Sequence, residues 1–324
     1  MRKLLMIFSD LHLDFYRRFS TTIAGGINSR LMKQVAAINK VKKLSEELQP
    51  EAIVFLGDFF NGQGATISKQ LYLIGYRLIS KLQETIPFYM LVGNHDIFGS
   101  NHILYPMAAL PNVRIISESQ VVELGGFKVG LQPWGGVRPE ADVILGHLDI
   151  EGAKTGIGYP LPATMHPQEF SSCKLVISGH FHSYQEIKPN IIFCGAVMPN
   201  DFGDCDEEYG GLLLFPDLHT ERLIIPSPKF LTISIPTQEA MDQFVEHKEK
   251  NFYKLICTDR KIVVPKFDHT VEVEWDVQEE MKARLEYAVD EPLEDVLCKY
   301  IEQANTAIDK EEAKRIIREV MKEC

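Results

Sequence analysis

The sequence predicts an α/β fold, and three observations lead to this prediction. Short apolar runs recur along the chain without polar alternation, a pattern typical of strands that are buried on both faces. Segments with the three- and four-residue apolar spacing of helices separate the first three of these runs. A polar motif that contains Asp, Asn or His directly follows five of the runs. Because open α/β sheets place their ligands at the carboxyl ends of the strands, we expect all five motifs to lie at one rim of the sheet.

Each predicted element rests on a run or a spacing of its own. The five strands that precede a motif are predicted at residues 4–8, 52–56, 89–92, 143–145 and 175–177. Helices are predicted from the apolar positions between residues 31 and 44 and between residues 71 and 82. Further short strands are predicted at residues 113–116, 128–131, 191–193 and 212–215. This first domain is expected to end near Pro226-Ser227-Pro228, so its predicted range is 1–226.

Beyond this boundary the pattern changes. Residues 227–286 are predicted to form a small α+β domain, with strands at 230–235, 252–257 and 271–275 and a helix near 239–248. Residues 287–324 are predicted to form a helical pair, whose second helix begins with Asp309 as its N-cap and has Glu312 three residues later. Two interpretations of the pair remain open: it packs on its own domain, or it presents an apolar groove to a partner.

The composition indicates an ordinary globular protein in a reducing compartment. Of the 324 residues, 45% are hydrophobic and 24% are charged, and no apolar run approaches the length of a membrane span. The six cysteines are scattered without regular spacing, so we expect reduced thiols and a cytoplasmic location. The first apolar run is too short for a signal peptide and ends without a cleavage site, so we expect a buried strand there.

The charge balance bears on the kind of partner. A formal net charge of −11 argues against a protein that binds nucleic acid alone over a wide surface. Basic side chains nevertheless gather in the first part of the chain: Arg17, Arg18, Arg30, Lys33, Lys40, Lys42 and Lys43. Both a solvated helix face and a contact with nucleic acid remain open for this cluster.

The five polar motifs carry the chemistry. They are Asp10-Leu11-His12, Gly57-Asp58, Gly93-Asn94-His95-Asp96, Gly146-His147 and Gly179-His180-Phe181-His182. Together they supply two carboxylates, one amide and four imidazoles of metal-ligand type, and one further histidine. Oxygen and nitrogen ligands in this mixture suit a pair of divalent ions of the Mn, Fe or Zn kind.

Spacing and residue type suggest how the ligands divide between two ions. A carboxylate is the best bridge between neighbouring ions, and Asp58 on its tight turn is expected to be that bridge. Asp10 and His12 are two residues apart, so in an extended segment both can reach the same ion. We expect His182 to complete the ligand set of this first ion. The second ion is then expected to bind the remaining ligands together with Asp58. These remaining ligands are Asn94, His147 and His180.

His95 is expected to have a different task. It adjoins Asn94 but should point past the ions towards the leaving oxygen, where it can donate a proton or stabilise negative charge. Asp96 is expected to orient His95 by accepting a hydrogen bond from it. These two residues are therefore the predicted catalytic pair.

The order and types of these motifs resemble those of the calcineurin-like metallophosphoesterases. The resemblance implies a β-sandwich flanked by helices for residues 1–226, and hydrolysis of a phosphate ester by water that two metal ions activate. Phosphoprotein phosphatases of this fold carry Gly-Asp-x-x-Asp-Arg-Gly and Gly-Asn-His-Glu. Here the segment from Gly57 to Gly62 lacks the arginine and the second motif ends in Asp96, which disfavours a protein phosphatase.

The sequence that follows His182 narrows the resemblance further. The stretches at residues 194–199, 200–204 and 210–212 look like the turn, acidic loop and final strand of SbcD-type DNA repair nucleases. The overall layout is similar to that of the nuclease subunits of tailed-phage recombination endonucleases. In this comparison residues 227–286 resemble a DNA-capping domain. Asn61 is a departure, because archaeal and eukaryotic members have a histidine shortly after the bridging aspartate.

This resemblance implies a manganese-dependent exonuclease and endonuclease that acts on DNA. It further implies a coiled-coil ABC-type ATPase partner that binds the C-terminal helices, a homodimer within a heterotetramer, no membrane contact, and a host-cytoplasmic location if the source is a phage. Two alternatives stay open. One is a small-molecule or cyclic-nucleotide phosphodiesterase of the same fold, and the other is a non-catalytic scaffold, which would be expected to have lost some of the motif residues.

Overall fold

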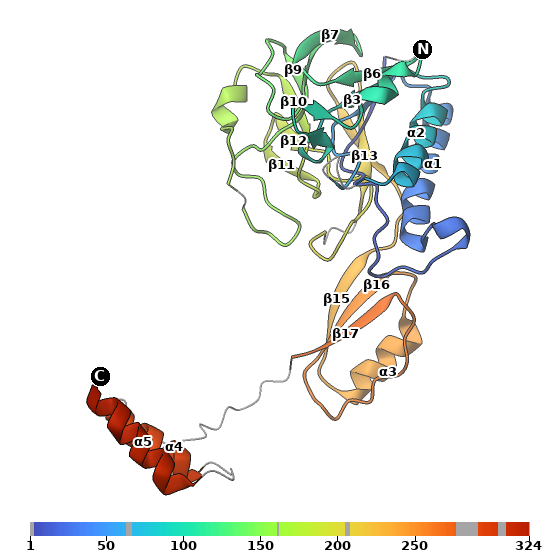
Figure 1. Ribbon diagram of the computed structural model, residues 1–324. Coiled ribbons are helices and arrows are strands. Elements are labelled where there is room, and N and C mark those ends of the chain that lie inside the picture. The colour runs from blue at the N-terminus through green and yellow to red at the C-terminus, as the bar shows by residue number, and fades with distance from the viewer. Residues whose placement is uncertain are drawn as a thin grey trace. The chain divides into compact units, whose positions relative to one another are not determined.

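The computed structural model describes residues 3–62, 67–160, 162–204, 208–276, 291–303 and 309–323. The chain divides into two compact units, Met1–Asp276 and Val277–Cys324. In the first unit, a helix-flanked pair of sheets and a smaller three-stranded sheet follow one another along the chain (Figure 1).

Two six-stranded sheets form the centre of the first unit. The first has the order β14-β13-β1-β2-β3-β6 and the second β11-β12-β10-β9-β8-β7. The strands of the first sheet are β1 (Leu5–Phe8), β2 (Ala52–Phe55), β3 (Phe88–Leu91), β6 (Val113–Ile116), β13 (Gly210–Leu214) and β14 (Thr220–Ile224). Those of the second are β7 (Gln120–Leu124), β8 (Phe127–Gln132), β9 (Val143–His147), β10 (Leu175–Gly179), β11 (Gln185–Lys188) and β12 (Ile191–Phe193). In each sheet four adjacent strands run parallel, and the remaining strands pair antiparallel.

The β-sandwich implied by the family resemblance is therefore confirmed, but the five motifs, expected at the rim of one sheet, are divided between two. Leu5 and Ile7 point into a core shared with the second sheet, whereas the alternate residues Met6 and Phe8 point into a core shared with helices. Apolar runs predict burial on both faces but do not reveal whether a helix or another sheet covers each face. The local sequence consequently could not distinguish one sheet from two.

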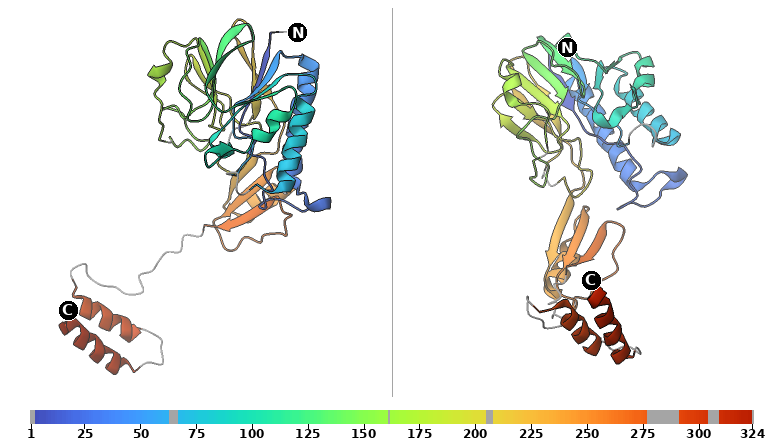
Figure 2. Two further views of the ribbon diagram at one scale, coloured as in Figure 1. Left: turned by 45° about the horizontal axis from the view of Figure 1, so that its top comes forward. Right: turned by 60° about the vertical axis from the view of Figure 1, so that its left-hand side comes forward.

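Two helices cover the outer face of the first sheet, as Figures 1 and 2 show. α1 (Ser29–Leu48) begins after Asn28, whose Oδ1 accepts a hydrogen bond from Leu31 N at 2.9 Å. α2 (Lys69–Leu82) begins after Ser68, which caps Leu71 N at 3.1 Å. The short elements between the longer ones are β4 (Ile97–Phe98), β5 (Asn101–His102) and 3₁₀ turns at Ala24–Gly26, Asn94–Asp96, Tyr105–Ala109 and Pro167–Phe170.

The smaller sheet, which we call the module (residues 230–275), follows the β-sandwich. It consists of the parallel strands β15 (Phe230–Ile235), β16 (Phe252–Cys257) and β17 (Val271–Trp275), with α3 (Gln238–His247) between the first two. The three predicted strands and the helix are confirmed. The predicted domain range of 227–286 stays a prediction, since residues 277–286 lie outside the described residues and the module belongs to the same compact unit as the β-sandwich.

The second unit contains α4 (Leu293–Gln303) and α5 (Lys310–Glu323), which pack against each other. Asp309 Oδ1 accepts hydrogen bonds from Glu311 N at 3.0 Å and Glu312 N at 3.3 Å, so the predicted N-cap is confirmed. Arg318 of α5 lies 3.7 Å from a carboxylate oxygen of Glu294 in α4. Of the predicted 287–324 range, residues 287–290, 304–308 and 324 lie outside the described residues.

Two general expectations can be compared with the fold. Within the described ranges, no helix combines the length and the apolar character needed to cross a bilayer. The structure also describes four cysteines as free thiols: Cys173, Cys194, Cys257 and Cys298.

The packing of α2 yields a stability prediction at Gly75. A Cβ atom there would lie 2.6 Å from the ring of Phe60, which is fully buried. Alanine normally stabilises a helix by about 1 kcal/mol relative to glycine, but overpacking a core costs about 1–3 kcal/mol. We expect Gly75→Ala to lower the free energy of unfolding by about 1–2 kcal/mol in urea titrations. Leu73→Ala, at an exposed position of the same helix, is the control, and a more stable Gly75→Ala protein would contradict this packing.

Candidate metal centre

The five motifs meet where the parallel strands of both sheets end. Three motifs follow β1, β2 and β3 of the first sheet, and two lie at the ends of β9 and β10 of the second. The structure brings together all the predicted site residues, which are Asp10, His12, Asp58, Asn94, His95, Asp96, His147, His180 and His182. The predicted rim is therefore real, but it is shared between the two sheets of the β-sandwich.

One cluster consists of Asp10, His12 and His182. Their nearest ligand atoms all lie within 4.8 Å of one another. His12 Nε2 is 3.1 Å from His182 Nε2 and 3.8 Å from Asp10 Oδ1. Two imidazole nitrogens that face each other across this distance beside a carboxylate form a geometry suited to a shared cation.

A second cluster consists of Asp58, His147 and His180, again with ligand atoms within 4.8 Å. Asn94 Oδ1 lies between the two rings, 2.9 Å from His147 Nε2 and 3.2 Å from His180 Nδ1. Three oxygen or nitrogen donors thus converge with the amide oxygen. This is the same grouping as the one expected for the second ion.

Asp58 lies between the two clusters. Its Oδ2 is 3.7 Å from His12 Nε2 and 3.4 Å from His147 Nε2, so one carboxylate oxygen faces both groups. Its Oδ1 accepts a hydrogen bond from the backbone N–H of His95 at 2.8 Å. This placement is the one that a bridging ligand requires.

Burial makes these charges dependent on one another. Asp10 is fully buried and Asp58 is 2% exposed. Burial alone would raise the pKa of Asp58, but the neighbouring histidines, His147 above all, hold it well below its usual range. Burial likewise acts to raise the pKa of Asp10, and adjacent imidazoles, led by His12, lower it overall. Ionised carboxylates buried this deeply need cations nearby, so the donor set fits divalent ions.

The histidines differ in their affinity for protons. Burial opposes the charged form of His147 and His182, but nearby carboxylates raise the pKa of each ring to about 9. Burial and the charge of His147 lower the pKa of His180 to about 4. His180 is therefore neutral near pH 7, whereas His147 and His182 must lose a proton before they can bind a metal ion.

The backbone at the site is strained. Asp10, His12, Asp58 and His180 all have positive φ angles, of 54°, 47°, 58° and 86°. Each non-glycine residue in this region costs on the order of 1 kcal/mol, and such strain concentrates at functional sites. Gly93 shows how closely the motifs approach, since a Cβ there would lie 2.1 Å from Asp58 Oδ1. Glycine is therefore needed at position 93 because the Asp58 carboxylate occupies the space of a side chain there.

Hydrogen bonds fix the orientation of two of the rings. His147 Nδ1–H donates to the backbone oxygen of Leu56 at 2.8 Å, which directs Nε2 into the site. His182 Nδ1–H donates to Asp204 Oδ1 at 2.9 Å, which directs its Nε2 towards His12. Both rings thus have the second nitrogen occupied, as metal-binding histidines generally do.

The prediction that His95 donates a hydrogen bond to Asp96 is wrong. The Asp96 carboxylate is fully buried and accepts backbone N–H groups instead, from Gly93 at 3.0 Å and Asp58 at 2.9 Å, with Phe59 and Phe60 also in range. These donors occupy its lone pairs and join the Gly57-Asp58 turn to the Gly93 turn. Burial and the charge of Asp58 raise the pKa of Asp96 to about 7. Asp96 therefore shapes the backbone of the site and lies too deep to contact a substrate.

His95 is oriented by a different partner. Its Nδ1 lies 3.0 Å from the backbone oxygen of Asn61, which can only accept, so the ring donates. The Asn61 side chain in turn donates to Asp14 Oδ2 at 3.0 Å. His95 also stands close enough to His12 and Asp58 to group with them by distance, so proximity alone does not distinguish it from a ligand.

Sequence reasoning missed several residues that support the site. Asp204 lies in the acidic loop that marked the family resemblance, but its bond to His182 had no local signal. Gln34 donates from α1 to the backbone oxygen of His12 at 2.8 Å, although it looks like an ordinary helix residue in the sequence. Trp134 places its ring 4.8 Å from that of His180. Of these three residues, only Gln34 could have been suspected from the sequence, by a search for polar residues on the buried face of a predicted helix.

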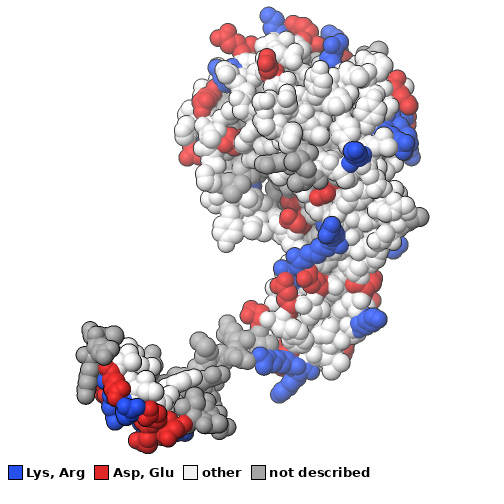
Figure 3. Space-filling view, in the orientation of Figure 1, with Lys and Arg blue, Asp and Glu red and all other residues white. Residues whose placement is uncertain are grey.

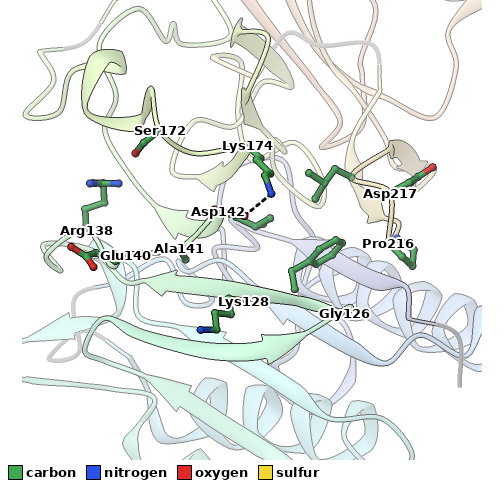
Figure 4. A pocket seen from close by; sticks show the side chains of 13 residues that line it. Gly126, Lys128, Arg138, Glu140, Ala141, Asp142, Ser172, Lys174, Pro216 and Asp217 are labelled. Atoms are coloured by element: carbon green, nitrogen blue, oxygen red, sulfur yellow. Dashed lines mark ion pairs between the residues drawn. The ribbon is translucent and has the colours of Figure 1, made fainter.

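A large hollow lies elsewhere in the first unit (Figure 4). Lys128, Asp142 and Lys174 line it near the amino-terminal ends of β8, β9 and β10, whereas the motifs lie at the carboxyl ends. Lys174 forms an ion pair with Asp142 at 2.6 Å. The hollow is therefore separate from the metal centre, and its charges are partly paired.

The chain belongs to the calcineurin-like phosphoesterase family, whose model matches residues 4–184. It is 26% identical over 207 residues to "Putative phosphoesterase 244L" of Invertebrate iridescent virus 6, a match that covers 55% of this chain and 72% of the viral protein. It is 24% identical to "Exonuclease subunit 1" of Enterobacteria phage T4, over 58% of this chain and 59% of that protein. Members of the family bind divalent metal ions, and the donor set of the two clusters fits them.

The histidine pKa values lead to a pH prediction. With both His147 and His182 at about 9, each ring is protonated near pH 7 and must release a proton when a metal ion binds. Affinity at each cluster should therefore rise about tenfold per pH unit between pH 6 and 9 and then level off. Titration calorimetry with Mn²⁺ in buffers of different ionisation enthalpy would count the released protons.

Asp204→Asn is the matched variant for this experiment. It removes the carboxylate that raises the pKa of His182, so the pH dependence of the first cluster should shift to lower pH while that of the second is kept. An affinity that stays constant between pH 6 and 9 would contradict protonated His147 and His182 rings in the metal-free protein.

Proposed function

We propose that this protein is a metal-dependent nuclease that hydrolyses phosphodiester bonds of DNA. The observation that carries the proposal is the pair of clusters that share Asp58, with His95 beside them, in a chain of the phosphoesterase family. The similarity to a protein named as an exonuclease subunit supports DNA as the substrate. All the motif residues are present and converge, which argues against a scaffold that has lost its chemistry.

The proposed ligands follow the two clusters. Asp10, His12 and His182 would hold one ion, and Asn94, His147 and His180 the other. Asp58 would hold both. Two divalent ions in these positions, which we propose to be Mn²⁺, would activate water as the nucleophile and neutralise charge on the phosphate.

His95 is proposed to act on the leaving oxygen. Its Nδ1–H is held by the backbone oxygen of Asn61, so Nε2 is the nitrogen available to a substrate. A proton held at Nε2 can pass to the leaving oxygen as the P–O bond breaks, or stay and stabilise the charge that develops there. Asp96 supports this reaction only by fixing the two turns that carry Asp58 and His95.

The surface charge supports a protein that does not bind DNA alone. Lys42 forms an ion pair with Glu46, Lys43 lies 3.7 Å from Glu47, and Arg18 donates to Glu272 at 2.7 Å. Three of the seven residues of the early basic cluster are thus paired with carboxylates, two along α1 and one with the module. Figure 3 shows basic and acidic side chains interspersed over the face that it draws. A partner would then supply electropositive surface for DNA.

We propose that the partner is a coiled-coil ABC-type ATPase and that the helices in residues 287–324 bind it. In α4 and α5, four large side chains of mainly apolar character are about half exposed: Leu293, Tyr300, Ile316 and Val320. An apolar stripe of this kind suits another helix. We further propose a nuclease domain in residues 1–226, a DNA-capping domain in 227–286, a homodimer within a heterotetramer, and action on DNA in the cytoplasm.

The substrate prediction can be tested with purified protein. With Mn²⁺ present, and with the ATPase added in a parallel reaction, the chain should degrade linear duplex DNA, and gel electrophoresis of end-labelled DNA would follow the products. Asp58→Asn is the negative control, since it removes the shared carboxylate charge. Rapid hydrolysis of a small diester or a cyclic nucleotide without any cleavage of DNA in either reaction would contradict the nuclease proposal.

The role of His95 leads to a separate prediction. His95→Ala should lower kcat for DNA cleavage by about 10²–10⁴-fold, because general acid catalysis contributes about that much. The variant should still bind two Mn²⁺ ions, as counted by titration calorimetry, since His95 is not a proposed ligand. Loss of one ion would instead make His95 a ligand, and unchanged kcat would refute its role in proton transfer.

A further inference from the structure

Arg30 is a buried cation between the metal centre and the module. It lies in the first turn of α1 and is only 7% exposed. Burial lowers the pKa of its guanidinium group, and the charges of Asp201, Asp14 and Asp204 act in the opposite direction. Such a cation is costly to bury and is stable only where its surroundings are fixed around it. Its contacts connect it with residues of the metal centre on one side and with the module on the other.

One contact leads from Arg30 to His182. The Arg30 guanidinium donates a hydrogen bond to the backbone oxygen of Asn200. Asn200 N donates to Asp204 Oδ2 at 2.6 Å, and the other oxygen of Asp204 accepts from His182 Nδ1 at 2.9 Å. The loop around Asn200 thus helps to position the His182 ring through Asp204.

A second contact leads to His12. The Arg30 guanidinium lies 4.0 Å from the centre of the Tyr16 ring, a distance suited to a cation–π contact. Tyr16 Oη donates to the backbone oxygen of His12 at 3.2 Å. The two histidines whose Nε2 atoms face each other across 3.1 Å are therefore both connected to the same guanidinium.

The opposite side of Arg30 contacts the module. Its guanidinium lies 4.9 Å from the ring of Phe230 and 5.7 Å from that of Phe252, the first residues of β15 and β16. These two rings stack at 4.6 Å and pack with Phe19 in one small aromatic cluster. Phe230 and Phe252 are thus module residues that lie directly against Arg30.

We propose that Arg30 is a positioning residue that links the packing of the module to the geometry of His12 and His182. The guanidinium contacts the Phe230 and Phe252 rings and also donates a hydrogen bond to the Asn200 carbonyl. It can do both at once only when the module is in its described position. The second cluster has no such connection among the described contacts of Arg30. Asn94, His147 and His180 lie at the ends of β3, β9 and β10, and their printed hydrogen bonds run to one another and to Leu56 after β2. This inference rests on the proposed metal ligands.

The test measures metal binding at each cluster separately. A His147→Ala background leaves the Asp10, His12 and His182 cluster, and a His182→Ala background leaves the other. Adding Arg30→Met should weaken Mn²⁺ binding about tenfold or more in the first background and less than twofold in the second, by titration calorimetry. Lys33→Met is the control, because Lys33 also contacts the Phe252 ring, at 4.1 Å, but has no hydrogen bond to the Asn200 loop among the described contacts.

A second variant tests the link from the module. Phe230→Leu leaves Arg30 in place but removes the ring against it, and should weaken the first cluster selectively, as Arg30→Met does. Arg30→Lys keeps a cation at this position if Arg30→Met does not fold, and should give a smaller but equally selective loss. Thermal unfolding followed by circular dichroism verifies the fold of each variant.

The outcomes separate the possible failures. Lower thermal stability with unchanged Mn²⁺ affinity in both backgrounds would make Arg30 a purely structural residue and overturn the proposal. A loss with Arg30→Met but none with Phe230→Leu would overturn the link to the module. If neither background binds Mn²⁺ while Arg30 is intact, the proposed ligands are wrong, and the inference fails with them.

Discussion

The burial of two ionised carboxylates at the junction of two sheets is the constraint on which the site depends. Asp10 and Asp58 have almost no access to water, so imidazoles and backbone N–H groups must stabilise their charges. The β-sandwich provides these groups because its two parallel sets of strands end at the same rim. One set contributes the carboxylates, and the other contributes His147, His180 and His182. Neither of the two proposed metal clusters is supplied by one sheet alone.

Much of the fold could be predicted because it is encoded locally. The strands at residues 113–116, 191–193, 230–235, 252–257 and 271–275 agree with the predicted bounds, since each is an apolar or alternating run with polar ends. Edge strands such as β7 and β11 were missed, because half-exposed sequences such as Gln185–Lys188 carry too few apolar residues to stand out. The apolar runs by themselves could not give the number of sheets, because it depends on which apolar faces meet and not on any one segment; the β-sandwich came from the family resemblance.

The site, like the fold, has a part that the sequence predicts and a part that it does not. The motif residues could be recognised because metal chemistry restricts the side chains that serve it, and strand ends restrict where they stand. The groups that orient them could not, since Asp204, Gln34 and the Asn61 carbonyl lie in separate segments and have no fixed spacing from the motifs. Asp96 illustrates the limit. Its neighbour in the sequence is His95, but its hydrogen-bond partners are the backbone groups of two turns.

The carbonyl that holds His95 has a consequence for how this protein can diverge. A main-chain oxygen is supplied by every amino acid, so the orientation of His95 does not depend on which side chain occupies position 61. A substitution at position 61 can therefore replace the asparagine side chain and still leave in place the acceptor that orients His95. The chemistry of the side chain at position 61 can thus vary while the orientation of the neighbouring imidazole is kept.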